Sequence, residues 1–193
     1  SARLITAGLA LALCTASFAL GIGDKAPALT FDKWVKGKPV KGFEKGKWYV
    51  VEFWATWCGP CRQSIPHITE LAKKHKNVTF IGANVWEERN PTDTKWHAKV
   101  DTFVKEMGDK MGYNVAIDTL KGDMAKNWMQ AAEQGGIPTA FLIDGSGTIA
   151  WIGHPMEMDE VLDKAVAGKW SIAEAKKAQE QERAMEADFQ KIN

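Results

Sequence analysis

The sequence predicts an α/β fold built on a central mixed β-sheet flanked by helices. Between residues 48 and 134, short runs of β-branched and aromatic residues alternate with longer stretches of helical periodicity, the pattern of parallel strands joined by helices. Two later apolar runs, at residues 139–143 and 148–152, are separated by Asp144-Gly145-Ser146-Gly147, which predicts a hairpin. The sheet is therefore expected to end in an antiparallel pair.

The chain begins with an apolar stretch at residues 4–20 that follows Arg3. Because Ser17 and Ala19 offer small residues for cleavage, the stretch is typical of an export signal. A membrane anchor is the alternative, since about 17 residues is the short limit for a spanning helix. We divide the chain into three parts: a signal peptide or anchor at 1–23, a domain at 24–170 and a charged C-terminal helix at 171–193.

The first half of the domain contains the expected strands and the first helix. Residues 23–30 are predicted to be extended, and the glycine- and lysine-rich residues 31–47 to form a surface β-hairpin. The apolar run at residues 48–54 predicts a buried strand, and apolar side chains at helical spacing predict a helix over residues 63–76. A second buried strand is expected at residues 78–85.

In the second half, turn and N-cap signals at residues 90–93 precede a helix that ends by Gly112. A strand at 114–118, a helix at 122–134 and a helix at 158–167 follow. The tail is rich in Ala, Glu, Lys and Gln and has a thin apolar stripe. It is expected to lie on the domain as a helix or to fray, and the alternative is a helix that binds a partner or a second copy.

Composition and charge restrict the function classes. The chain has 193 residues, 45% of them hydrophobic, which suits one globular domain with extensions. The formal net charge is +1, so the chain does not have the excess of basic residues that nucleic-acid binding requires. The four histidines show no metal-ligand spacing, and no second ligand pair suits the cysteines, so no metal is predicted.

The chemistry is expected at Cys58-Gly59-Pro60-Cys61, where two cysteines follow a strand and begin a helix. A thiol at a helix N-terminus faces unpaired N–H groups and the positive end of the helix dipole, which lower its pKa and make Cys58 the nucleophile. Cys61, one turn on, can close a small ring with it. Cys14 is expected to leave with the signal. A disulfide that closes so short a loop removes little entropy from the unfolded chain and therefore stabilises the fold only weakly. We therefore predict that the pair is a redox centre, in an oxidising compartment.

Two motifs together resemble the thioredoxin superfamily: Phe53-Trp54-Ala55-Thr56-Trp57-Cys58-Gly59-Pro60-Cys61 and Gly136-Ile137-Pro138-Thr139. The leading Gly23-Asp24-Lys25-Ala26-Pro27 and the Phe-Trp-Ala-Thr-Trp form resemble its exported TlpA/ResA-like branch, among the redoxin or AhpC/TSA-like proteins. The resemblance implies a thioredoxin fold, with Pro138 in a cis peptide beside the disulfide. It also implies that substrate binds at five residues: Trp57, Gly59, Pro60, Ile137 and Pro138.

Two acids are assigned to the site on the same resemblance. Glu52 occupies the position at which thioredoxin carries a buried acid, whose pKa burial raises. We therefore assign it as the general base for Cys61, although the TlpA/ResA branch often has a neutral amide here and an exposed glutamate is the alternative. Glu87 follows the second strand, where ResA-like proteins place an acid near the site. Glu88 could equally be that residue, and a solvated loop role is open for both.

The predicted activity is that of an exported, periplasmic thiol-disulfide oxidoreductase with no cofactor beyond its own disulfide. Cys58 attacks a substrate disulfide, and Cys61 resolves the mixed disulfide. By analogy with the branch, it would reduce disulfides in exported proteins, such as apocytochrome c, and be recharged by a membrane thiol-disulfide electron donor. An oxidant or isomerase role stays open, because the sequence does not fix the redox poise.

Two alternatives lie outside this activity. A thiol peroxidase needs a Thr-x-x-Cys motif, whereas Thr56 is only two residues before Cys58. A redox-independent binding or assembly module would keep the fold and dock through the tail helix.

Overall fold

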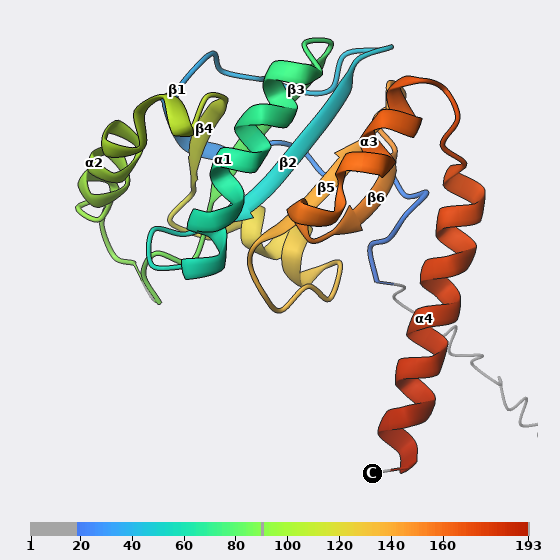
Figure 1. Cartoon of the computed structure of the whole chain (residues 1–193). Coiled ribbons are helices and arrows are strands. Elements are labelled where there is room, and N and C mark those ends of the chain that lie inside the picture. Colours follow the sequence, from blue (N-terminus) through green and yellow to red (C-terminus); the bar gives the residue numbers. More distant parts are fainter. Residues whose placement is uncertain (1–18, 90, 193) are drawn as a thin grey trace, which may run out of the picture.

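The computed structural model describes residues 19–89 and 91–192. It is built on one six-stranded sheet in the order β1-β4-β3-β2-β5-β6 (Figure 1). The strands are β1 (Phe31–Lys36), β2 (Trp48–Trp54), β3 (Val78–Asn84), β4 (Asn114–Asp118), β5 (Thr139–Ile143) and β6 (Ile149–Gly153). β2, β3 and β4 run parallel, whereas β1, and β5 with β6, pair antiparallel. The predicted mixed sheet with an antiparallel end is confirmed.

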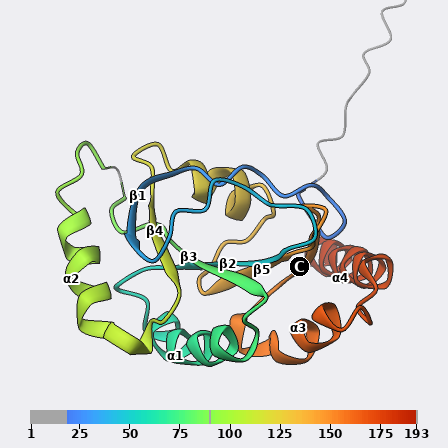
Figure 2. The same cartoon turned by 90° about the horizontal axis from the view of Figure 1, so that it is seen from above.

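Helices cover both faces of the sheet. The α-helices are α1 (Gly59–Lys74), α2 (His97–Met107), α3 (Asp159–Val166) and α4 (Ile172–Ile192). The shorter elements are two 3₁₀ turns, η1 (Gly108–Lys110) and η3 (Pro155–Glu157), and a π-helix, η2 (Ala125–Gln130). α1 and α3 lie on one side of the sheet, at the bottom of Figure 2, and η2, drawn in yellow, lies on the opposite side.

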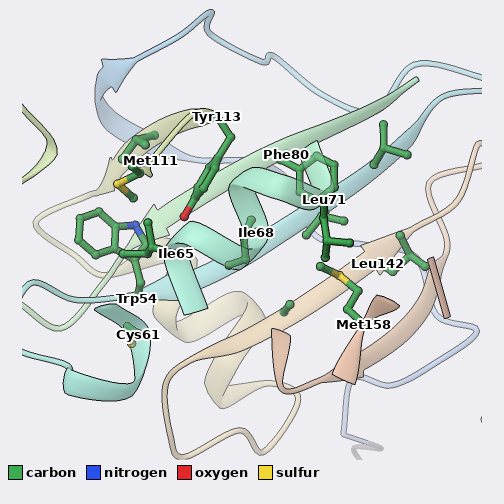
Figure 3. Packing of buried hydrophobic residues seen from close by; sticks show 14 of the residues in the cluster. Trp54, Cys61, Ile65, Ile68, Leu71, Phe80, Met111, Tyr113, Leu142 and Met158 are labelled. Carbon is green, nitrogen blue, oxygen red and sulfur yellow. The ribbon is translucent and has the colours of Figure 1, made fainter. Parts of the chain in front are cut away.

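Two hydrophobic cores follow from the alternation of side chains along the central strand β2. Val50 and Trp54 face α1 and belong to a cluster that includes Cys61, as Figure 3 shows for several of its members. The odd-numbered residues Tyr49, Val51 and Phe53 face η2 and pack in the second cluster. Glu52, even-numbered, therefore lies on the α1 side.

The prediction of a surface β-hairpin at residues 31–47 is wrong. The segment supplies a single strand, β1, which pairs antiparallel with β4 at the sheet edge. Phe31 and Trp34 pack against the core on the η2 face, and Gly37 then turns the chain with a φ of 77°. Burial of these two aromatic side chains favours the distant partner over a local one.

Two helices differ from their predicted extents. α2 begins at His97, after the turn signals, and its N-cap is Trp96. The helix expected at residues 122–134 is widened into the π-helix η2, which buries Trp128 and Met129 against the sheet. The C-terminal helix is present as α4.

The first half of α4 holds the N-terminal extended segment on the domain. Gln179 Oε1 accepts a hydrogen bond from Ile22 N–H at 2.9 Å, and Arg183 Nη2 donates to the Leu20 carbonyl at 3.0 Å. On its other side, Leu20 N–H donates to the Ala131 carbonyl at 2.7 Å. The rest of α4 extends beyond the sheet (Figure 1).

The apolar segment predicted at residues 4–20 falls almost wholly outside the described residues. Among the helices that are described, none combines the length and the apolar character needed to cross a membrane.

Candidate active site

The two predicted redox cysteines form a disulfide at the N-terminus of α1, with their Cα atoms 5.3 Å apart. Cys58 is the N-cap of the helix, and its Sγ accepts a hydrogen bond from Cys61 N–H at 3.2 Å. The first turn contains no acidic residue, and Pro60 lies in it, where a missing N–H costs no helix hydrogen bond. The unpaired N–H groups of the helix end therefore act on Cys58 without an opposing carboxylate.

Cys58 is the more exposed of the two cysteines, although both are buried. Its residue is 3% exposed and Cys61 is 0% exposed. Cys58 Sγ lies 3.6 Å from the carbonyl oxygen of Ile137, in the segment whose Ile137–Pro138 peptide bond is cis. A groove of about 450 Å³ in this segment is lined by Pro60, Ile137, Pro138 and His154, among others. An incoming sulfur would therefore meet Cys58 first.

The remaining predicted substrate-binding residues flank this groove or the cysteines. Trp57 is 56% exposed, and its Nε1 donates a hydrogen bond to the Trp86 carbonyl at 2.9 Å. The bond ties the residue before Cys58 to the loop after β3. Gly59 is exposed, with no atom within 4 Å of the place where a Cβ would stand, so the surface over the disulfide is open.

Glu52 is fully buried, which excludes the exposed-surface alternative. On β2 it lies between Val50 and Trp54, which share a cluster with Cys61. Burial raises the pKa of the Glu52 carboxyl from 4.5 to about 8. A carboxyl with such a pKa can exchange a proton near neutral pH.

Glu87 is buried too, which excludes the solvated loop role. Its carboxylate accepts hydrogen bonds from Thr56 N–H at 2.5 Å, from Thr56 Oγ1 at 2.8 Å and from Asn84 Nδ2 at 2.8 Å. Lys99 Nζ lies 3.1 Å from Glu87 Oε2. Glu88 is exposed. Through Thr56, which is two residues before Cys58, Glu87 thus fixes the loop that carries Cys58.

Several residues of this network were missed from the sequence. Arg62 Nε donates a hydrogen bond to the Thr56 carbonyl at 2.8 Å, so Thr56 is hydrogen-bonded through both its N–H and its carbonyl. Asn84 stands three residues before Glu87, a spacing that hints at their contact. Lys99 lies on α2 and gives no local signal.

Across residues 19–89 and 91–192, no three histidine, cysteine, aspartate or glutamate side chains gather so that they could hold a metal ion.

Comparison with known proteins gives a consistent picture. Residues 22–152 match the AhpC/TSA family. The chain is 33% identical to Protein FixW of Rhizobium leguminosarum over 156 residues, which are 78% of this chain and 68% of FixW. It is 29% identical over 146 residues to the thiol-disulfide oxidoreductase ResA of Geobacillus kaustophilus, covering 72% of each chain.

Solved structures agree with these relatives. A thiol:disulfide interchange protein of the thioredoxin family from Chlorobium tepidum superposes with a TM-score of 0.56 at 28% identity, over 76% of this chain and 99% of the other. The thioredoxin domain of a thiol-disulfide oxidoreductase from Bacteroides vulgatus gives 0.56 at 25% identity, over 76% and 98%. With the disulfide at the start of α1, these matches show that the chain belongs to the AhpC/TSA family, among its thioredoxin-like thiol-disulfide oxidoreductases.

Proposed function

We propose that the protein reduces disulfide bonds in exported proteins by a two-step exchange at Cys58 and Cys61. The observation that carries the proposal is the Cys58–Cys61 disulfide at the start of α1, with Cys58 beside the Ile137 carbonyl and the adjoining groove. Trp57 and Pro60 offer apolar surface there, and the Ile137 backbone offers hydrogen-bonding groups to an extended peptide.

In the first step, the Cys58 thiolate of the reduced protein attacks one sulfur of the substrate disulfide. A mixed disulfide forms, and the other substrate sulfur leaves as a thiolate that takes a proton from water. In the second step, Cys61 transfers its proton to Glu52 and attacks Cys58. The Cys58–Cys61 bond closes, and the second substrate thiolate leaves, so the substrate gains two electrons.

Glu52 is proposed as the general base of the second step because it shares the α1 side of the sheet with Cys61. Its raised pKa suits proton exchange near pH 7. Glu87 is proposed as a positioning residue instead of a catalytic one, because its hydrogen-bond partners in the described chain are Thr56 and Asn84. No organic cofactor or metal enters this reaction.

The reducing direction and the partners are part of the proposal. Gly59 and Pro60 between the cysteines resemble the reducing type, and the names of relatives such as ResA describe thiol-disulfide oxidoreductases. The oxidised protein would be recharged by a dithiol electron donor in the membrane, through the reverse exchange. Apocytochrome c is the proposed substrate class, by analogy with the branch.

Export is supported by the N-terminal segment. Cleavage after Ala19 would make Leu20 the first residue of the mature protein. Leu20 is the residue whose backbone N–H donates a hydrogen bond to the Ala131 carbonyl. The proposed boundary of the mature domain therefore moves from 24 to 20. N-terminal sequencing of the protein from a periplasmic extract tests it: Leu20 at the start supports cleavage, and a retained N-terminus supports an anchor.

The reduction potential of the Cys58/Cys61 couple, equilibrated against glutathione, tests the direction. A value near that of thioredoxin, about −270 mV, is expected for a reductase. A value near about −120 mV, as for a strong oxidant, would contradict the reducing role while leaving the exchange chemistry intact.

A further inference from the structure

Three polar groups beneath the disulfide are buried without a hydrogen-bond partner in the described part of the chain. They are the two carboxyl oxygens of Glu52, the hydroxyl of Tyr113 and Nε1 of Trp54. Buried polar groups in folded proteins are nearly always paired, directly or through an internal water. Their grouping therefore calls for a common explanation.

The three groups meet at one place in the sheet. Glu52 is in register with Gly82 on β3 and with Ala140 on β5, so small residues flank the carboxyl on both sides. A Cβ added at Gly82 would lie 3.0 Å from Tyr113 Cε2 and 3.1 Å from Trp54 Nε1. The absence of a side chain at Gly82 thus lets the tyrosine ring and the indole N–H close over the sheet next to Glu52.

Tyr113 reaches this place from the loop before β4. Figure 3 shows its hydroxyl directed into the space between the sheet and α1, toward Ile65 and on the side of Trp54. Burial, and then the charge of Glu52, raise the pKa of the Tyr113 hydroxyl well above 10. The hydroxyl therefore keeps its proton and can only act as a donor toward a carboxylate.

We propose that Tyr113 is a positioning residue of the exchange reaction, which donates a hydrogen bond to the Glu52 carboxylate through one internal water held between the two groups. Trp54 Nε1 is the third partner of that water, and three polar partners are typical of an internal site. The inference rests on the proposed role of Glu52 as base. It adds the group that lets this base carry a negative charge in an apolar core.

Among the elements packed around Glu52, titratable groups are few. Gly82 and Ala140 on the flanking strands have none. The start of α1 contributes Cys58 and Cys61 of the same cluster, and the loop before β4 contributes Tyr113. A hydrogen bond to the ionised form lowers the pKa of a carboxyl and opposes the effect of burial. Removing the Tyr113 hydroxyl should therefore raise the pKa of Glu52.

The test compares Tyr113→Phe with Tyr49→Phe, a matched control that removes a buried hydroxyl from the opposite face of β2. The Tyr49 hydroxyl accepts a hydrogen bond from Glu44 N–H at 3.0 Å, away from the site. The ¹³C NMR titration of the Glu52 side-chain carboxyl in the reduced protein reports its pKa. Single-turnover release of a thiol from a preformed mixed disulfide, followed against pH, reports the second step.

Burial holds the pKa of Glu52 above 7, so at pH 7 each further unit of pKa lowers the ionised fraction about tenfold. In Tyr113→Phe we expect the Glu52 pKa to rise, and the ionised fraction and the rate of the second step at pH 7 to fall together, by about tenfold for a rise of one unit. The first step, attack by Cys58, keeps its rate, and Tyr49→Phe keeps both the pKa and the rate.

A Glu52 pKa in Tyr113→Phe within about 0.3 unit of wild type overturns the inference, and so does an equal shift in Tyr49→Phe. If Tyr113→Phe does not fold, 3-fluorotyrosine incorporated at position 113 serves instead; as a stronger donor of nearly the same shape it should lower the pKa of Glu52, and an unchanged pKa refutes the inference. Glu52→Gln distinguishes the base role of Glu52 from the hydrogen bond donated by Tyr113. If this variant leaves the rate of the second step unchanged while Tyr113→Phe shifts the Glu52 pKa, the proposed base role is wrong and the hydrogen bond is supported.

Discussion

Replacing Glu52 by glutamine keeps the shape of the side chain and removes its titration from the core. In the folded protein, burial raises the pKa of this carboxyl to about 8, whereas its ordinary value, which applies to the unfolded chain, is 4.5. Between these two pH values the folded protein holds a proton that the unfolded chain has released. The free energy of unfolding therefore depends on pH through this one group.

The sign follows from the proton count. Because the folded state binds the extra proton, raising the pH from 4.5 toward 8 destabilises the wild type, by about 1.4 kcal/mol per pH unit. Below 4.5 both states are protonated and above 8 both are ionised, so the dependence levels off at each end. Between pH 5 and 7 the wild type should lose about 3 kcal/mol relative to Glu52→Gln.

Guanidinium chloride unfolding of both oxidised proteins at pH 5, 6, 7, 8 and 9 measures this difference. Groups common to both proteins, including the four histidines, cancel when the two unfolding free energies are subtracted, and the disulfide-bonded cysteines do not titrate. A difference that stays constant from pH 5 to 7 would refute the account of Glu52 as a carboxyl held protonated by burial. A difference that grows in favour of the wild type would show the opposite sign of pKa shift.

Three further substitutions test the Cys58 loop, the substrate surface and the start of η2. Glu87→Gln weakens the hydrogen bonds from Thr56 and should cost about 1–3 kcal/mol in chemical unfolding, so unchanged stability would contradict its positioning role. Trp57→Ala removes a side chain that is 56% exposed and should alter stability by less than about 0.5 kcal/mol, while kcat/KM for insulin reduction falls; equal kcat/KM would remove Trp57 from the substrate surface. Asp118 accepts hydrogen bonds from the N–H groups of Met124 and Ala125, so Asp118→Ala should cost about 1–2 kcal/mol and Asp118→Asn less, as thermal unfolding can check; equal losses would argue against capping.

The elements that local pattern defines were predictable from the sequence. β2, β3 and the β5–β6 hairpin are bounded by turn residues and are mostly apolar, and α1 carries its apolar side chains at helical spacing. The pairing of β1 was missed because its partner β4 lies about eighty residues on, and nothing local distinguishes a hairpin from an edge strand. The π-helical widening of η2 has no sequence signal.

The candidate site divides in the same way. The cysteines and the Ile137–Pro138 segment were found from motifs, and the structure brings them together around one groove. Tyr113 was not found, because it approaches Glu52 only through the strand order β4-β3-β2, which the sequence does not reveal. Glu87 was found, but its role changed, since its bonds to Thr56 and Asn84 depend on how the loop after β3 folds back on the Cys58 loop.

Trapping of the mixed disulfide shows whether Cys58 attacks and Cys61 resolves. Reduced Cys61→Ser is mixed with a disulfide-containing peptide, and the adduct is mapped by mass spectrometry after digestion. We expect a stable one-to-one mixed disulfide on Cys58, with no such adduct on Cys58→Ser under the same conditions. A stable adduct on Cys61 in the Cys58→Ser protein, with none on Cys58 in Cys61→Ser, would reverse the two roles.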